Sequence, residues 1–226
     1  MSSESSSRRL LVMAVIGGIV LVTLIGVGIY GLIVGPPDHD HQSTPTTTTP
    51  SESTPSGPSR PASWEDLPAL PDTGDPIRYA SAVAEALLTW DTMSGLAPID
   101  YARPVIVGAD PSGYETPGLV SDVANFLPTD AVWQELRHYS TRQTATVDAA
   151  FVPDSWDSIA ASASAGELRE GTVAVTVEAT RHRAGEWFDR PATSDHPITF
   201  TVFVACQPTF DRCHTLRLSL PDQPLL

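Results

Sequence analysis

Residues 173–179 read Val-Ala-Val-Thr-Val-Glu-Ala, so that a valine or alanine occupies every second position of one face. Such alternation is typical of a β-strand with one face in the core, because successive strand side chains point to opposite faces. The same period of two recurs at residues 147–151, 198–204 and 216–220. We therefore predict that the second half of the chain forms an antiparallel sheet of four or more strands.

The connection between the second and third predicted strands is residues 184–196, which are rich in Gly, Asp, Pro and charge and indicate a turn. Two neighbouring aromatic residues, Trp187 and Phe188, stand within this polar stretch. They predict either an exposed tip that binds a partner or an anchor that fixes the loop in the core.

Cys206 and Cys213 are the two cysteines of the chain, and they flank the connection between the last two predicted strands. A disulfide here would close a hairpin and stabilise the fold by about 2 to 3 kcal/mol in the chain-entropy model. His214 follows directly, but two thiols and one imidazole at this spacing match no complete zinc site. We predict a structural disulfide and no metal site.

Helical periodicity precedes the strands. Asp75 and Pro76 suit the cap and first position of a helix, and apolar residues then recur at helical spacing over residues 75–94, before Gly95. A second helix is predicted after Thr129, carrying Trp133 and neighbouring apolar residues on one side.

Shorter helical pieces are expected near residues 119–126, whereas residues 155–165 fit either a short helix or a loop. Prolines interrupt the helical pattern between residues 98 and 117. Helices first and strands afterwards predict an α+β domain in which N-terminal helices pack on one antiparallel sheet.

A run without charged side chains begins at Leu10 and ends at Val34, directly after Arg8 and Arg9. As a helix it would be about 37 Å long, enough to cross a hydrocarbon core of about 30 Å. The basic pair predicts a cytoplasmic N-terminus, and no small-residue cleavage pattern follows the run. We expect a cytoplasmic tail at residues 1–9, a transmembrane helix at 10–34 and a single-pass protein of the cell membrane.

Residues 35–74 are expected to be a linker rich in Pro, Ser and Thr, and residues 36–61 of it contain no aliphatic or aromatic side chain. Such a segment cannot build a core, which predicts a disordered tether. The remainder, residues 75–226, has the length of one domain and is expected to lie outside the membrane.

The net charge is −14, from 13 basic and 27 acidic residues. A field of this sign repels nucleic acid and anionic headgroups, so we expect no nucleic-acid partner. The chain also lacks the glycine-rich phosphate motifs, the G-x-S-x-G nucleophile turn and the paired zinc-ligand motifs. These patterns favour a protein that is not an enzyme and has no cofactor.

A long helix, two shorter helical pieces and then an alternating antiparallel sheet, over about residues 75–220, resemble the cone-shaped nuclear-transport-factor-2-like fold, also called cystatin-like in its broad sense. Behind a short tail, one anchor and a tether, this arrangement is similar to bitopic assembly components of type IV secretion and conjugation systems. It is also similar to membrane proteins associated with actinobacterial mammalian-cell-entry lipid-import complexes. Relatives in Gram-positive conjugation often carry two such domains, whereas this chain has room for one.

The resemblance implies a non-catalytic scaffold or assembly component whose exported domain contacts other envelope proteins. Small-residue pairs in the predicted anchor, such as Gly31 with Gly35, would allow a homo-oligomer. An accessory protein of a lipid-import complex and a small-ligand-binding domain are alternatives. A further alternative is an extracytoplasmic isomerase-like or hydratase-like enzyme.

Enzymes of the cone-shaped fold carry acid–base groups in the cone mouth, which here points to Asp91, Asp100, Tyr101 and His138 as candidates. Each also fits a structural role at a helix end, a turn or the edge of the core. Trp90 and Trp133 are expected in the core and would form the wall of a pocket if the domain holds a ligand.

Overall fold

A computed structural model describes residues 63–164 and 166–226, all within the compact unit Ser56–Leu226. The predicted cytoplasmic tail and transmembrane helix, and the linker as far as residue 62, lie outside the described residues. Within the described part of the chain, no helix has both the length and the apolar character needed to cross a bilayer.

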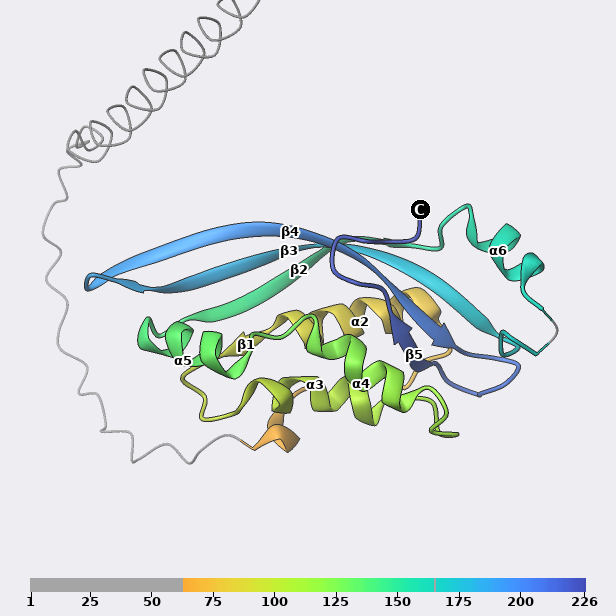
Figure 1. Ribbon diagram of the computed structural model, residues 1–226, viewed down its shortest axis with the longest axis horizontal. Coiled ribbons are helices and arrows are strands. Elements are labelled where there is room, and N and C mark those ends of the chain that lie inside the picture. Colours follow the sequence, from red (N-terminus) through yellow and green to blue (C-terminus); the bar gives the residue numbers. More distant parts are fainter. Residues whose placement is uncertain (1–62, 165) are drawn as a thin grey trace, which may run out of the picture. The chain divides into compact units, whose positions relative to one another are not determined.

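Five strands form one antiparallel sheet in which each strand pairs with its neighbours in sequence, in the order β1-β2-β3-β4-β5 (Figure 1). This confirms the predicted α+β class and antiparallel sheet. The strands are β1 (Trp90–Asp91), β2 (Arg142–Phe151), β3 (Thr172–Trp187), β4 (Arg190–Ala205) and β5 (His214–Leu218).

Five α-helices and one 3₁₀ turn complete the described domain, and α2 to α5 lie on the same side of the sheet (Figure 1). The C-terminal segment passes over the other side, where the Leu225 amide donates to the Thr201 hydroxyl at 2.8 Å. The helical elements are η1 (Trp64–Asp66), α2 (Pro76–Leu88), α3 (Pro98–Val107), α4 (Thr116–Ala124), α5 (Asp130–His138) and α6 (Trp156–Ser162).

The core lies between α2 and the sheet. Ala80, Val83, Ala84 and Leu87 follow one another at helical spacing and are fully buried. They meet the inward-facing side chains of the two longest strands, among them Val175, Val177, Phe200 and Val202. The apolar alternation of the sequence therefore corresponds to the face of the sheet that α2 covers.

Helix α2 begins where the sequence predicts and ends earlier. The Asp75 carboxylate accepts hydrogen bonds from the amides of Ile77 and Arg78, at 3.0 and 3.2 Å. The helix stops at Leu88 because Trp90 and Asp91 pair with β2 as the short strand β1. Pairing with a strand thus overrides the helical period that predicted a helix to residue 94.

Helix α3 forms where the prolines were expected to interrupt helical structure. Pro98 occupies the first turn, where a missing amide proton costs nothing, and Pro104 lies inside the helix. Tyr101, Ala102 and Val105 are buried on the same element. Tertiary burial therefore supports a helix with an internal proline.

Strands β3 and β4 pair continuously from Thr172 with Ala205 to Trp187 with Arg190. The prediction of a turn over residues 184–196 is therefore wrong, because only Phe188 and Asp189 lie between the strands. Their φ angles are 49° and 56°. Positive φ at both positions is the requirement of a type I′ turn, whose twist matches that of the strands.

The predicted disulfide between Cys206 and Cys213 is confirmed, and it joins the connection between β4 and β5. Both cysteines are buried, and the Cys213 amide donates to the Thr73 carbonyl at 2.8 Å. This backbone hydrogen bond ties the segment before α2 to the chain just before β5.

Replacing Leu87 with Ala is expected to lower the free energy of unfolding by about 2 to 5 kcal/mol, since it removes methyl groups from a fully buried site. The matched control, Leu220→Ala, alters a leucine with 47% of its surface exposed and should change that energy by about 0.5 kcal/mol or less. Urea denaturation measures both. Equal losses in the two variants would show that α2 does not pack as described.

Removing the disulfide with Cys206→Ala and Cys213→Ala together is expected to lower the free energy of unfolding by about 2 to 3 kcal/mol, because the unfolded chain gains loop entropy. Reduction of the unaltered chain should produce a similar loss in the same urea titration, and reductant should leave the double variant unchanged. A variant as stable as the oxidised chain would contradict this role.

Candidate functional site

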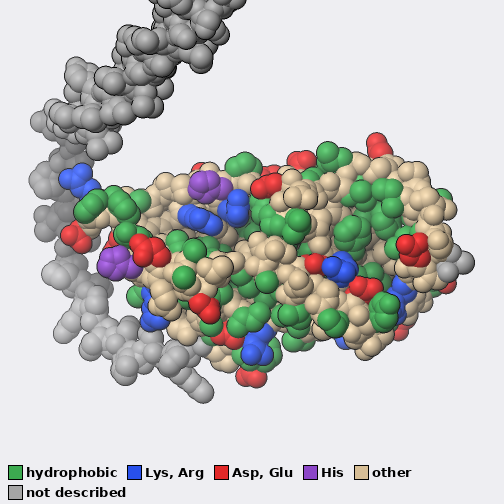
Figure 2. All heavy atoms as spheres, viewed as in Figure 1, with side chains coloured by type: hydrophobic (Ala, Val, Ile, Leu, Met, Phe, Trp, Pro, Cys, Tyr) green, Lys and Arg blue, Asp and Glu red, His purple; other side chains and the backbone are tan. Residues whose placement is uncertain are grey.

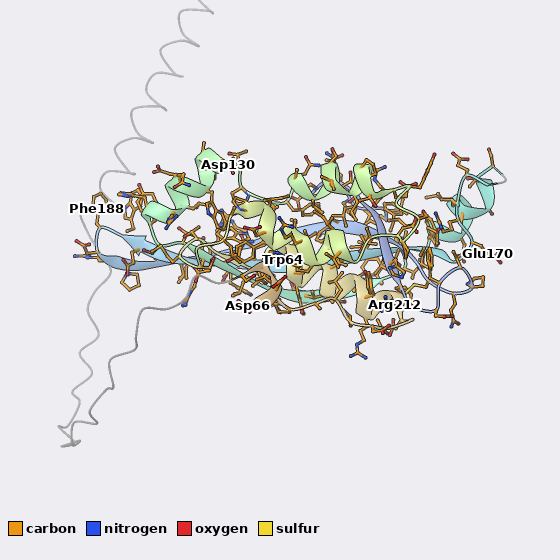
Figure 3. All side chains as sticks on the ribbon, turned by 90° about the horizontal axis from the view of Figure 1, so that it is seen from below. Trp64, Asp66, Asp130, Glu170, Phe188 and Arg212 are labelled. Carbon is orange, nitrogen blue, oxygen red and sulfur yellow. A yellow bond between two sulfur atoms is a disulfide. The ribbon has the colours of Figure 1, made fainter. Side chains whose placement is uncertain are left out.

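The long β3–β4 hairpin ends in two exposed aromatic residues. Trp187 is 52% exposed and Phe188 is 83% exposed. Phe188 lies at the end of the described domain opposite Glu170 (Figure 3). Hydrophobic side chains lie on the surface at this end of the domain, beside charged ones (Figure 2).

Aromatic rings continue from this turn to the end of α5. The ring centroids of Trp187 and Phe188 are 5.2 Å apart, and those of Tyr139 and Trp187 are 4.9 Å apart. His138 lies edge-on to Tyr139 with a centroid distance of 5.1 Å. We call Tyr139, Trp187 and Phe188 the aromatic tip, with the exposed His138 at its border.

The backbone fixes Tyr139 against the hairpin. The Glu186 amide donates to the Tyr139 carbonyl at 2.8 Å. A Cβ atom placed on Gly185 would lie 2.8 Å from the same carbonyl oxygen, which is closer than real Cβ contacts. Glycine at position 185 therefore permits the contact that joins the end of α5 to β3.

A second buried cluster lies beneath α5 and contains Trp90, Tyr101 and Trp133, each at most 5% exposed, together with Leu96. The ring centroid of Trp133 is 5.4 Å from that of Trp90 and 5.9 Å from that of Tyr101. The two tryptophans thus pack against each other in the core. This cluster supports α5, which carries one part of the aromatic tip.

The candidate acid–base residues make local contacts. Tyr101 donates its hydroxyl to the Asp91 carbonyl at 2.9 Å, and the Asp91 carboxylate accepts from the Met93 amide at 2.7 Å. Asp100 accepts from the Ala97 amide at 2.9 Å. His138 is exposed at the end of α5.

Apart from the Tyr101–Asp91 backbone contact, the described hydrogen bonds and ion pairs connect no two of these candidates. In residues 63–164 and 166–226, no group of three or more His, Cys, Asp or Glu side chains is placed to hold a metal ion. The arrangement therefore offers no assembled acid–base pair among the residues that sequence reasoning selected.

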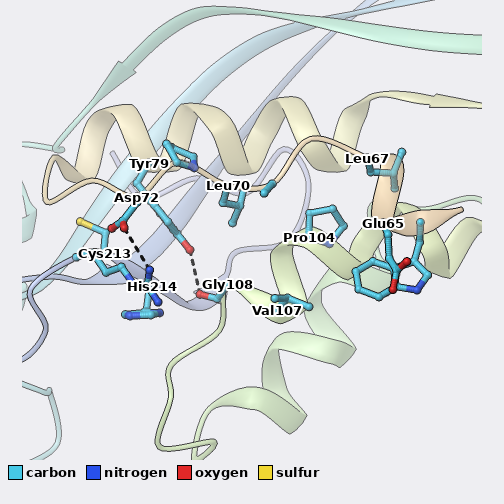
Figure 4. A pocket seen from close by; sticks show the side chains of 14 residues that line it. Glu65, Leu67, Leu70, Asp72, Tyr79, Pro104, Val107, Gly108, Cys213 and His214 are labelled. Carbon is cyan, nitrogen blue, oxygen red and sulfur yellow. Dashed lines mark hydrogen bonds and ion pairs between the residues drawn. The ribbon is translucent and has the colours of Figure 1, made fainter.

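The described residues form several hollows, and two of them concern the candidate functions. One, of about 420 Å³, lies between the segment that follows η1 and helices α2 and α3. Asp72, Tyr79 and His214 lie at one end of it and Glu65 and Leu67 at the other, with Leu70, Pro104 and Val107 between them (Figure 4). Trp90 and Trp133 do not line it.

The polar end of this hollow contains two buried hydrogen-bonding groups. The Tyr79 hydroxyl donates to the Gly108 carbonyl at 2.9 Å, and burial raises the pKa of Tyr79 despite its contacts with Thr215. The His214 side chain is buried, and its Nδ1 atom has no hydrogen-bond partner among the described residues. An unpartnered buried nitrogen is suited to a polar group of a ligand.

The other hollow, of about 320 Å³, lies directly behind the aromatic tip. Its wall includes Tyr139 and Trp187 from the tip, together with Thr141, Arg183 and Ser194. No sequence motif marks this hollow, because its residues come together only when β3 pairs with β4 and the end of α5 packs against β3. The aromatic tip is therefore continuous with a largely apolar concavity whose charged residues are Arg183 and Glu186.

The turn at the tip is an unusual place for a large apolar residue. A left-handed backbone costs roughly 1 to 2 kcal/mol for a residue with a Cβ atom, and type I′ turns favour Asn-Gly. Phe188 adopts this conformation while most of its ring faces solvent. Backbone strain of this kind that brings no burial is characteristic of functional positions.

Replacing the turn with Phe188→Asn and Asp189→Gly is expected to raise the free energy of unfolding by about 1 to 2 kcal/mol, because both new residues accept positive φ. Urea denaturation of the double variant beside the unaltered chain measures the difference. A loss of stability would instead show that Phe188 contributes more through its contact with Trp187 than its backbone costs.

No protein-family model, no curated protein and no solved structure matches the chain.

Proposed function

We propose that the chain is a non-catalytic, membrane-anchored scaffold or assembly component of an envelope-spanning transfer machine, and that its exported domain contacts partner proteins through the aromatic tip. The observation that carries this proposal is the exposure of Trp187 and Phe188 at the end of the hairpin. Tryptophan and tyrosine are enriched among the residues that dominate the energy of protein interfaces. The predicted anchor at 10–34 and the linker would hold this tip outside the membrane.

The size of the tip also fits a protein contact. Aromatic side chains bury about 150 to 250 Å² each when fully covered, and the three residues of the tip supply only part of roughly 450 to 750 Å² because Tyr139 and Trp187 are already partly buried. A stable interface takes about 800 Å² from each partner. The aromatic tip would therefore form the centre of an interface and would need neighbouring surface to complete it.

A second candidate function is the binding of a small, mostly apolar ligand in the hollow of Figure 4. Its volume of about 420 Å³ lies in the range of ligand pockets, and His214 offers an unpartnered buried nitrogen at its polar end. This candidate corresponds to the ligand-binding alternative and uses other residues than the tip.

The test is a cross-linking pull-down of the full-length chain from its native membranes. Replacing both Trp187 and Phe188 with Ala is expected to reduce partner recovery by about tenfold or more, because central aromatic contacts carry most of the binding energy. Recovered subunits of a conjugation or of a lipid-import machine would identify which assembly the chain serves.

The matched control is Tyr114→Ala, which removes an aromatic ring that is 82% exposed at another site. It should leave partner recovery unchanged. If the tip variant recovers the same partners as the unaltered chain, the tip is not the docking site. If no partner is recovered and a small molecule co-purifies with the unaltered chain, ligand binding is the better function.

A further inference from the structure

Two arginines stand side by side on β3, behind the aromatic tip. Arg181 and Arg183 are two residues apart, so they share the face of the strand that carries Val177 and Ala179 into the core. In the sheet, Arg181 lies opposite His196 of β4 and Arg183 lies opposite Ser194. The apolar inner face of the hairpin thus changes to a basic one where the core ends.

Within the described part of the chain, neither arginine has an acidic partner. In residues 63–164 and 166–226, four other arginines have a carboxylate oxygen within 4.0 Å, and Arg181 and Arg183 have none. The described arginines at positions 78, 137, 142 and 190 also lack such a partner, but they are exposed to water, whereas Arg181 and Arg183 are partly buried. Water can therefore solvate the four exposed arginines fully, whereas it solvates Arg181 and Arg183 only in part.

The surroundings hold the pair in place without neutralising it. Arg183 donates from Nε to the Gln143 amide oxygen at 2.8 Å, and its guanidinium lies 5.7 Å from the centroid of the Trp90 ring. Arg181 donates from Nη2 to the Pro197 carbonyl at 3.3 Å, while its buried Nε has no acceptor among the described residues. Burial, and then the charge of Arg181, lower the pKa of Arg183.

Partly buried, adjacent like charges destabilise the free domain, and an anion between them would relieve both desolvation and repulsion. Guanidinium groups bind carboxylates through two parallel hydrogen bonds. A side chain that is already held in place, such as Arg183, loses less entropy when it forms them. The chain as a whole, at net charge −14, repels extended polyanions. A short segment with one or two carboxylates suits a small basic site within an acidic surface.

We propose that Arg181 and Arg183 form a carboxylate-binding site that receives an acidic segment of the protein docked on the aromatic tip. This inference rests on the proposed docking function, because the hollow that contains Arg183 is also lined by Trp187 and Tyr139 of the tip. The arginine pair supplies the neighbouring surface that the tip needs to complete an interface, and it selects partners by charge.

The test measures binding of a fluorescent hexaglutamate peptide to the purified full-length chain in detergent, by fluorescence anisotropy at low salt. Hexaglutamine is the uncharged comparison peptide. Hexaglutamate should bind more tightly than hexaglutamine, and Arg181→Gln with Arg183→Gln should weaken its binding by about tenfold or more, as two charge-assisted contacts are lost. Arg181→Lys with Arg183→Lys keeps the positive charge but loses the paired donors of the guanidinium. Its affinity for hexaglutamate should lie between those of the unaltered chain and the glutamine variant.

A double variant, Arg103→Gln with Arg212→Gln, is the matched control, because it removes the same charge from two exposed ion pairs. It should change hexaglutamate binding less than about twofold. Thermal unfolding of each variant shows whether it is folded, and the lysine variant keeps the test decisive if the glutamine variant unfolds.

Equal binding of the two peptides by the unaltered chain, or an equal loss in the control, would overturn the proposal. Binding of inorganic phosphate that depends on the pair, without binding of hexaglutamate, would also overturn it in favour of a small-anion site. The Trp187→Ala and Phe188→Ala variant separates the two proposals. If that variant keeps both its partners and its arginine-dependent peptide binding, docking at the tip fails and the carboxylate site remains.

Discussion

The structure depends on the close packing of α2 against the sheet. Ala80 and Ala84 are small enough to let the helix backbone approach the strands, and Val83 and Leu87 fill the space on either side. At about 25 cal/mol per Å² of buried apolar surface, the fully buried side chains of this contact contribute to the stability of the fold. It also sets where the core ends, because the inner face of β3 is apolar only as far as Ala179.

Beyond that point the hairpin continues without a core of its own. Its inner face carries Arg181 and Arg183, and its end carries the aromatic tip. The second cluster around Trp133 supports α5, and α5 holds Tyr139 against Gly185. The end of the hairpin therefore contributes little to the core, and α5 still holds it in a fixed position. Rigid support of an exposed aromatic group reduces the ordering entropy that binding would otherwise cost.

The elements predicted correctly from the sequence are those marked by a local pattern of residue types. The alternation at residues 173–179 predicted the centre of β3, the Asp75 cap predicted the start of α2, and the pairing of Cys206 with Cys213 was predicted from their spacing. The extension of β3 was missed because arginine, histidine and glycine at residues 181–185 do not alternate in polarity. The turn was missed because Phe188-Asp189 lacks the Asn-Gly signal of its geometry.

The candidate site could be predicted only in part from the sequence. Trp187 and Phe188 were selected from their place in a polar stretch, with exposure and burial both left open. Arg181 and Arg183 were not selected, because the lack of an acidic partner depends on the folded structure and cannot be read from adjacent residues in the sequence. The hollow at His214 was hidden for a related reason, since its wall joins segments that are far apart in the sequence.

The order of the elements has a consequence for synthesis. Helix α2 is made before the sheet, and the two long strands that meet its apolar face follow about 90 to 120 residues later, a separation that slows folding through loop-closure entropy. At translation rates of about 5 to 20 residues per second, the helix waits roughly 5 to 20 seconds for its partners. During that interval the elements made earlier, α3 and β2, are available to pack against α2, and the cover from β3 and β4 is still missing. The β3–β4 hairpin, by contrast, is local in sequence and can form as soon as Ala205 has emerged.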